Sequence, residues 1–222
     1  MFPLSDIAPR RRFPFINYLI IIITIYVFYL QLTAPNFEEF IFNYGFIPSR
    51  FSFFDLSSYQ YIFYSIFIHG GFFHILSNLW FLHIFGDNVE DRLGHLNYLM
   101  FYILAGVAAV FAQYFFNLGS NIPMIGASGA ISGVTGAYFV LFPRGRIKAI
   151  VPVFFGFYDI IILPAWFFLG YWFLIQIFSG VGSLVAFDIN QGGVAWFAHI
   201  GGFLFGYFLA KRFKKDVDFI FN

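Results

Sequence analysis

The sequence predicts an all-α membrane protein, a single domain over residues 1–222 with six transmembrane helices and both termini in the cytoplasm. Apolar residues make up 60% of the chain and charged residues only 10%. A soluble domain has about 25% charged residues, so too few charges remain here to cover a soluble surface. Several long stretches also carry no charge at all. This composition is typical of a chain embedded in a lipid bilayer.

Each predicted helix is an apolar stretch close to the roughly 20 residues that a bilayer requires. Gly70-Gly71 divides the uncharged run that ends at Gly86. The polar segment "NLGSNIP" (117–123) divides the uncharged run between residues 96 and 143. The predicted helices span residues 13–32, 71–86, 96–116, 127–143, 160–178 and 194–210.

The basic residues support this count and give the orientation. Eleven of the twelve Lys and Arg residues fall on one side of a six-helix arrangement, and only Arg50 falls on the other. Basic residues favour the cytoplasmic side, whereas five or seven helices would place a basic end outside. The longest outer loop, residues 33–70, is rich in Phe and Tyr, so we expect it to lie half-immersed at the membrane interface.

Composition also bounds the function. The chain has no cysteine, which excludes thiol chemistry and disulfides. Its net charge of +1 does not indicate nucleic-acid binding, which is typical of strongly basic surfaces. A small transporter would need intramembrane carboxylates and inverted repeats, and neither is visible. The expected surroundings are the lipid bilayer, and the sequence carries no signal for an oligomeric state.

A few polar residues stand inside the predicted helices, where such groups are costly and often functional. Counting about 1.5 Å per residue from the cytoplasmic ends places His74, Ser128 and His199 at similar depth, about 6–12 Å below the outer surface. His74 and Asn78 are four residues apart and therefore share a helix face. Three helices thus bring a hydroxyl and two imidazoles to one level.

Small residues beside these groups predict close helix contacts. Ser128 is followed by Gly129 and Gly133, and His199 is followed by Gly202 and Gly206. Such stripes let helix backbones approach closely. If the two stripes pack together, Ser128 and His199 come within hydrogen-bond reach.

Simpler interpretations remain open for each residue. Taken alone, Ser128 is a packing serine bonded to its own helix, and His199 is a satisfied buried imidazole. A metal site at His69 and His74 is disfavoured because five residues place them about 140° apart on a helix, so no metal is predicted. Taken together, a serine beside a histidine is typical of an activated nucleophile.

Three motifs resemble the signature of rhomboid intramembrane serine proteases of the bacterial, six-helix type. They are "HGGFFHILSNLWFLHIFGDNVEDRLG" (69–94), "GASG" (126–129) and "AHIGG" (198–202). Their order, spacing and host helices match, and the resemblance covers nearly the whole chain. Any one motif alone would be weak, whereas three together are specific.

The resemblance implies a role for each matching residue. Ser128, set between Gly126 and Gly129, would be the nucleophile, and His199 the general base. The oxyanion would be bound by His74, Asn78 and the backbone N–H of Ser128, with His69 in support. No carboxylate is placed to orient His199, so the resemblance implies a Ser–His dyad without a cofactor.

The family likeness also predicts the setting of the reaction. The substrates would be single-pass transmembrane proteins, cleaved in or near their membrane segments. The protein would be a multi-pass protein of the cell membrane whose site opens to the extracytoplasmic side. The alternative is a non-catalytic rhomboid-like protein that binds transmembrane helices.

The sequence departs from the family pattern at two places. Gln60 and Tyr61 replace a Trp-Arg pair of many relatives, and Ser132 stands where some carry an aromatic residue that stacks on the histidine. The aromatic fifth helix should pack loosely and form a lateral gate for substrates. We expect it to contact the second helix near Phe73, Trp80 and Phe81, through residues such as Trp172.

Overall fold

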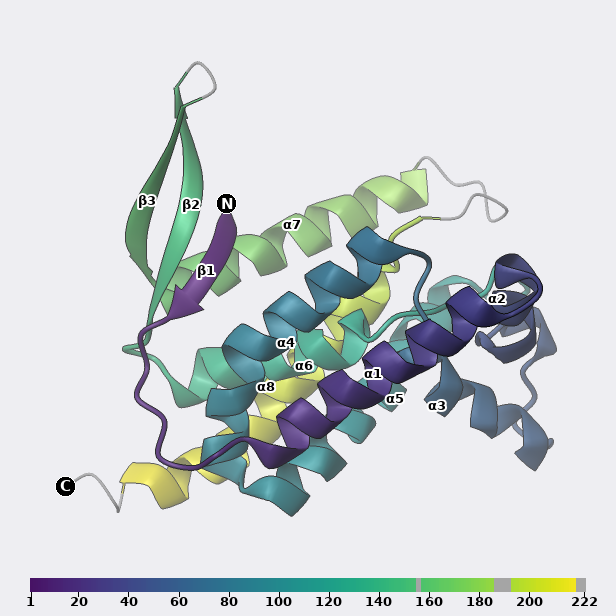
Figure 1. Ribbon diagram of the computed structural model, residues 1–222, viewed down its shortest axis with the longest axis horizontal. Helices are drawn as coiled ribbons and strands as arrows, with labels where there is room; N and C mark the ends of the chain where they lie inside the picture. The colour runs from purple at the N-terminus through teal and green to yellow at the C-terminus, as the bar shows by residue number, and fades with distance from the viewer. Residues whose placement is uncertain (155–156, 186–192, 219–222) are drawn as a thin grey trace.

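The computed structural model describes residues 1–154, 157–185 and 193–218 and is mostly helical (Figure 1). Its helices run side by side, and a three-stranded sheet projects from one end. The elements are β1 (Phe2–Asp6), α1 (Phe15–Thr33), α2 (Phe37–Tyr44), α3 (Gln60–Phe67), α4 (Phe72–Leu93), α5 (His95–Phe116), α6 (Ser128–Leu141), β2 (Arg146–Phe154), β3 (Phe157–Pro164), α7 (Ala165–Val185) and α8 (Trp196–Asp218).

Helix α6 forms the centre of the bundle and packs against α4, α5 and α8. All its residues are buried except Ser128 and Phe139, which are partly exposed. A helix of 14 residues is about 21 Å long, shorter than the roughly 30 Å of a bilayer core. Helix α6 is therefore too short to cross a bilayer core by itself, and it begins at Ser128.

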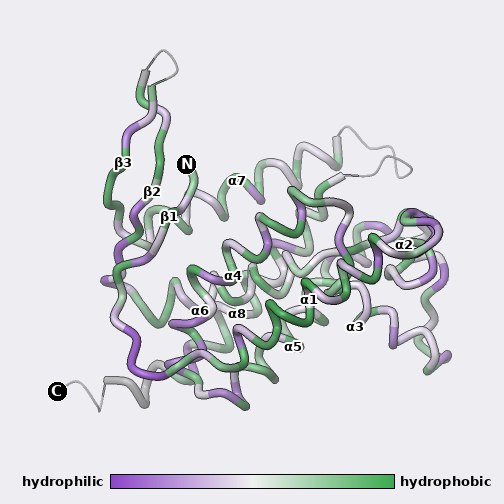
Figure 2. Tube along the Cα trace, viewed as in Figure 1, coloured by the Kyte–Doolittle hydropathy of each residue, from purple (hydrophilic) through white to green (hydrophobic). Residues whose placement is uncertain are grey.

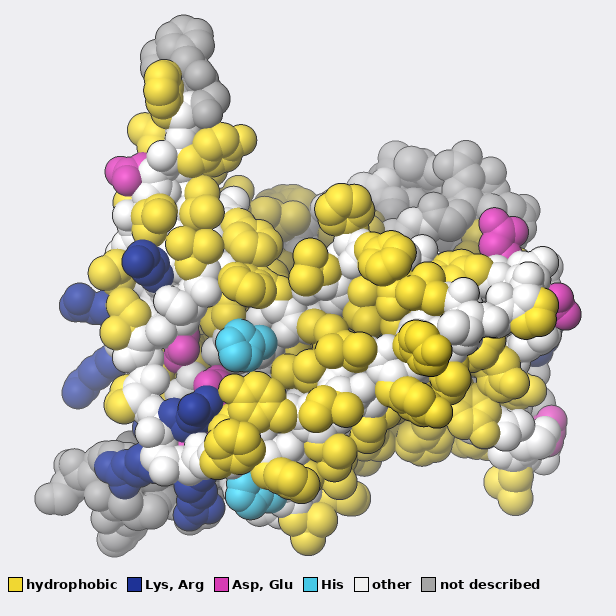
Figure 3. Space-filling model, viewed as in Figure 1, with side chains coloured by type: hydrophobic (Ala, Val, Ile, Leu, Met, Phe, Trp, Pro, Cys, Tyr) yellow, Lys and Arg dark blue, Asp and Glu magenta, His cyan; other side chains and the backbone are white. Residues whose placement is uncertain are grey.

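Three described helices, α1, α5 and α7, are long and apolar enough to cross a membrane. A fourth span forms if α4 is counted together with the bent segment before it. The tube in Figure 2 shows that these helices are mostly hydrophobic along their length. On the face seen in Figure 3, apolar side chains cover most of the surface, and most of the visible Lys and Arg side chains gather at one end. The protein is therefore a helical, multi-pass membrane protein.

Glycine at residues 70 and 71 separates two helical segments, as the sequence predicts. Gly71 has a φ of +154°, and the segment Leu56–Phe67 meets α4 at an angle of 84°. The predicted outer loop (33–70) is not irregular, because it forms α2, α3 and two short 3₁₀ turns, Pro48–Arg50 and Leu56–Tyr59. Its core is aromatic, with Phe46 and Phe51 packed against Tyr114 of α5.

The predicted helix over residues 160–178 is wrong at its beginning. Residues 157–164 form strand β3, and α7 runs from Ala165 to Val185. The β-branched run Ile160-Ile161-Ile162 suits a strand and pairs with β2, and Pro164 immediately precedes the helix. Of the predicted loop between the fifth and sixth helices (179–193), residues 179–185 belong to α7, and residues 186–192 lie outside the described residues.

The sheet was not predicted from the sequence. Its strand order is β1-β2-β3, and both pairs are antiparallel. Strand β1 lies between the hairpin and α4, because the indole N–H of Trp80 donates to the Pro3 carbonyl (2.7 Å) and the Phe2 ring stacks on Trp80. The N-terminal strand thus connects α4 to the hairpin that leads into α7.

Candidate active site

The structure brings Ser128 and His199 together from opposite parts of the chain. The Ser128 Oγ and His199 Nε2 atoms are 2.8 Å apart, although 71 residues separate the two residues. Ser128 is the first residue of α6, and His199 lies in the first turn of α8. Both side chains are partly buried. A hydroxyl hydrogen-bonded to an imidazole nitrogen is the arrangement in which a base can activate a nucleophile.

The predicted stripes of small residues cause this proximity. A Cβ atom added to Gly202 would overlap the Gly129 carbonyl oxygen, and one added to Gly206 would overlap the Gly133 carbonyl oxygen. The backbones of α6 and α8 are therefore in direct contact, which only glycine permits. This contact fixes the distance between the two helix beginnings and so between Ser128 and His199.

Gly126 shapes the turn that leads into α6. Its φ of +115° is a conformation that residues with a side chain rarely adopt, and its N–H donates to the Ser65 carbonyl (2.8 Å). A Cβ at Gly126 would lie 2.7 Å from His74 Nε2. The His74 ring therefore lies directly against the turn that ends at Ser128.

The hydrogen bonds of His74 define which of its nitrogens carries the proton. The backbone N–H of Gly70 donates to His74 Nδ1 (3.2 Å), so Nδ1 is an acceptor. In the neutral ring the proton is then on Nε2, the atom that faces Gly126. Asn78 shares this helix and is 5% exposed, and its side-chain amide donates to the His74 carbonyl (3.0 Å). The second N–H of that amide remains available as a donor.

His69 is fully buried and bound to α1. Its backbone N–H and carbonyl both pair with the Gln31 side-chain amide, each at 3.0 Å. Its Nδ1 lies 3.2 Å from the Phe67 carbonyl, and its ring meets His74 edge to face, with centroids 5.0 Å apart. His69 therefore joins the segment before α4 to α1 and lies against the His74 ring. Within the described residues, no group of three or more metal-binding side chains is found.

Sequence reasoning missed the residues that surround His199. The Gln176 Oε1 atom of α7 lies 2.8 Å from His199 Nδ1. The rings of Trp172 and Trp196 lie 5.9 and 6.2 Å from the imidazole. His199 therefore has aromatic neighbours, and they come from α7 and α8. A single amide within the apolar run "FLIQIF" was the available signal for Gln176.

Ser132, one turn along α6, is bonded differently from Ser128. Its Oγ donates to the Ser128 carbonyl (2.6 Å), the backbone contact typical of a serine within a helix. A small cavity of about 30 Å³ reaches Ser128, lined also by Ser65, Gly126 and Ala198. This is room for one or two water molecules. A larger cavity of about 250 Å³ lies in the outer segment, around Arg50 and Phe51, and does not reach Ser128.

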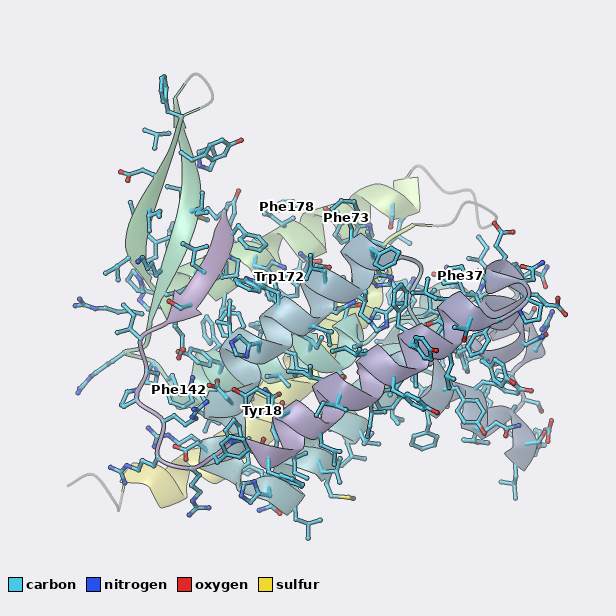
Figure 4. All side chains as sticks on the ribbon, viewed as in Figure 1. Tyr18, Phe37, Phe73, Phe142, Trp172 and Phe178 are labelled. Atoms are coloured by element: carbon cyan, nitrogen blue, oxygen red, sulfur yellow. The ribbon has the colours of Figure 1, made fainter. Side chains whose placement is uncertain are left out.

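The seam between α4 and α7 partly matches the expected lateral gate. Phe81 and Trp172 face each other with ring centroids 6.4 Å apart. Phe73 and Phe178 stand further along the same seam, 90% and 74% exposed (Figure 4). Trp80, which is also expected near this seam, binds strand β1 through its indole N–H.

Fold and site together define a multi-pass membrane protein with a serine–histidine pair at the end of a short central helix. The sequence matches the model of the Rhomboid domain family over residues 57–215, a range that includes Ser128 and His199. The chain therefore belongs to the rhomboid family, as its motifs predict.

Individual relatives come from organelles of eukaryotes. The chain is 30% identical over 149 residues to the presenilin-associated rhomboid-like protein, mitochondrial, of Homo sapiens, which covers 64% of this chain and 35% of the relative. It is 28% identical over 161 residues to Rhomboid protein 1, mitochondrial, of Saccharomyces cerevisiae, covering 68% and 42%. It is 38% identical over 68 residues to Rhomboid-like protein 11, chloroplastic, of Arabidopsis thaliana, covering 31% and 24%. The chain thus spans less than half the length of these relatives.

Proposed function

We propose that this protein is an intramembrane serine protease in which Ser128 is the nucleophile and His199 the general base. The observation that carries the proposal is the distance of 2.8 Å between Ser128 Oγ and His199 Nε2. Family membership supports it, because the rhomboid family includes such proteases. The family also includes non-catalytic members, so activity is the property to be tested.

The reaction follows from the two side chains. Ser128 Oγ attacks the carbonyl carbon of a peptide bond and passes its proton to His199 Nε2, which yields a tetrahedral oxyanion. The oxyanion collapses, the C–N bond breaks, and the imidazolium gives its proton to the leaving amine. Water, activated by the same imidazole, then hydrolyses the acyl-enzyme. The cavity beside Ser128 offers room for that water.

Three groups are proposed to stabilise the oxyanion. The proton on His74 Nε2 faces the turn at Gly126, and the Ser128 backbone N–H belongs to the first turn of α6, where it needs no helical partner. Asn78 adds the N–H that is not used within α4. Donors fixed in advance around the developing charge provide a large part of catalysis. His69 supports this set through its ring contact with His74.

The proposed substrates are single-pass transmembrane proteins, which reach the site laterally through the bilayer. In the proposed topology α1, α4, α5, α6, α7 and α8 all cross the membrane and both termini are cytoplasmic. In this topology the basic segment that follows α6 is cytoplasmic, so Ser128 at the other end of α6 is proposed to lie toward the extracytoplasmic side. The membrane is proposed to be a cell membrane, and the relatives' names make an organelle membrane the second candidate.

The test is expression beside a panel of tagged single-pass proteins, with wild type, Ser128→Ala and Ser132→Ala compared at equal protein levels. We expect cleavage products with wild type and Ser132→Ala and none with Ser128→Ala. Panel members that bind wild type and Ser128→Ala equally, with no product in any arm, would contradict the proposal and favour a non-catalytic binder of transmembrane helices.

A further inference from the structure

Gln176 is a buried amide, and both of its polar side-chain atoms are hydrogen-bonded. It lies on α7, a helix without charged residues, and is 4% exposed. Its Oε1 lies 2.8 Å from His199 Nδ1, and its Nε2 donates to the Trp172 carbonyl (3.1 Å). A polar side chain in such surroundings is costly unless its hydrogen bonds compensate for burial.

The second of these bonds fixes the orientation of the amide. The Trp172 carbonyl can only accept, so the atom facing it must be the NH₂ group of Gln176. The oxygen therefore faces His199, and an oxygen without a proton can only accept. It follows that His199 Nδ1 is the donor in this bond.

This donor assignment determines the state of the opposite ring nitrogen. A neutral imidazole carries one proton, and if that proton is on Nδ1, Nε2 has a free lone pair. His199 Nε2 is the atom that lies 2.8 Å from Ser128 Oγ. The ring is then in the tautomer that accepts the hydroxyl proton, which is the requirement for a general base.

We propose that Gln176 is the positioning residue of this site: it selects the Nδ1–H tautomer of His199 and aims Nε2 at Ser128. In this role Gln176 takes the place that a carboxylate has in a Ser-His-Asp triad, but it is a neutral acceptor. The effect on turnover rests on the proposed protease function, whereas the effect on the tautomer does not.

The location of Gln176 on α7 gives the inference a consequence for substrate access. Ser128 and His199 belong to α6 and α8, whose backbones are in direct contact. Gln176 belongs to the helix that borders the proposed gate, next to Trp172. An outward movement of α7 by about 1 Å stretches the bond to His199 beyond hydrogen-bond length. The tautomer is therefore fixed only while α7 is docked on α8.

The kinetic test compares Gln176→Leu with a matched variant, Gln113→Leu. Gln113 is also buried and hydrogen-bonds the start of α8 through the Ala198 N–H (3.1 Å), whereas the His199 ring is bonded by Gln176 and Ser128. We expect Gln176→Leu to lower kcat by about 10- to 100-fold with KM unchanged, as for the loss of a hydrogen bond to a charged group. Gln176→Glu keeps an acceptor and should retain most of kcat. Gln113→Leu should lower stability only.

The second measurement reads the tautomer directly, by ¹⁵N NMR of histidine-labelled protein with Ser128→Ala as the common background. We expect His199 to show a protonated Nδ1 and a bare Nε2, and Gln176→Leu to show a mixture of both tautomers. The proposal is overturned if the His199 pattern is the same with and without Gln176, or if both Leu variants lower kcat equally. A wild type without Ser128-dependent cleavage would refute the protease function, and the NMR arm would still decide the role of Gln176.

Discussion

Gly206 of α8 lies against the backbone carbonyl of Gly133 on α6, with no side chain between them. The same relationship recurs one turn earlier between Gly202 and Gly129. The stripe of small residues on α6 begins beside Ser128, and the stripe on α8 begins beside His199. The contact between the two stripes therefore sets the separation of Ser128 and His199. Backbone atoms cannot rotate away as side chains do, so this interface tolerates no added volume.

The first prediction is that Gly206→Ala destabilises the protein and abolishes activity together. The new methyl group would overlap the Gly133 carbonyl, and we expect a loss at or above the roughly 1–3 kcal/mol typical of overpacking. Gly182→Ala on α7 is the control, since nothing lies within 4 Å of its Cβ position. Thermal unfolding in detergent gives the melting temperatures of both variants. Equal melting temperatures for the two variants would contradict the direct backbone contact.

The second prediction concerns pH and the N-terminal strand. The Asp6 carboxylate accepts hydrogen bonds from Asn88 Nδ2 (2.7 Å) and Tyr138 Oη (3.0 Å), so it joins β1 to α4 and α6. Burial, with a smaller contribution from the charge of Asp87, raises the pKa of Asp6 from 3.8 to about 6. A raised pKa means that folding favours the protonated form. This contribution is complete below pH 3.8 and is lost as the pH rises through 6.

The measurement is the thermal unfolding midpoint of wild type minus that of Asp6→Asn, taken between pH 4 and pH 7.5. The neutral amide does not titrate, so other groups cancel in the difference. We expect wild type to gain stability relative to the variant as the pH falls from about 7 to about 4. A difference that stays constant over this range would contradict the shifted pKa.

The third prediction tests the lateral gate. Phe81 of α4 faces Trp172 of α7 across the seam, so Phe81→Ala should ease the separation of the two helices. We expect cleavage of membrane-embedded substrates to be as fast as in wild type or faster, with a lower melting temperature. Trp172 is unsuitable for this test because it also lies against His199. Slower cleavage by well-folded Phe81→Ala protein would count against the gate.

The fourth prediction is the topology. Reporter fusions at residue 222 and within residues 186–192 should report opposite sides of the membrane, with the C-terminus cytoplasmic. A third fusion at the N-terminus should agree with the one at the C-terminus. Signals from the same side at residue 222 and at 186–192 would refute six crossings.

The sequence predicts the centre of the molecule well because polar and small residues are rare in an apolar chain. Each predicted helix has a counterpart in the structure, and Ser128 and His199, for which the sequence predicts a similar depth, lie within hydrogen-bond distance. Glycine stripes then specified which helices touch. The role of these residues stays a prediction until activity is measured.

The missed features depend on long-range contacts that a hydropathy pattern does not encode. Residues 160–164 are apolar and continue directly into the apolar run of α7, and their pairing with β2 makes them part of a strand. In the sequence, Gln176 is one polar residue in an apolar helix. Its contact with His199 depends on the rotation of α7, which the sequence pattern does not give. Trp172 supplies an aromatic neighbour from a different helix than the family pattern suggests.

The most direct test of the central claim is the site of reaction with a fluorophosphonate, which modifies serines activated as nucleophiles. Mass spectrometry of the labelled wild-type protein should locate the adduct on Ser128. Labelling should persist in Ser132→Ala, whose hydroxyl is bonded to a backbone carbonyl, and should disappear in Ser128→Ala and His199→Ala. An adduct on another residue, or undiminished labelling of Ser128→Ala, would contradict the assignment of Ser128 as the nucleophile.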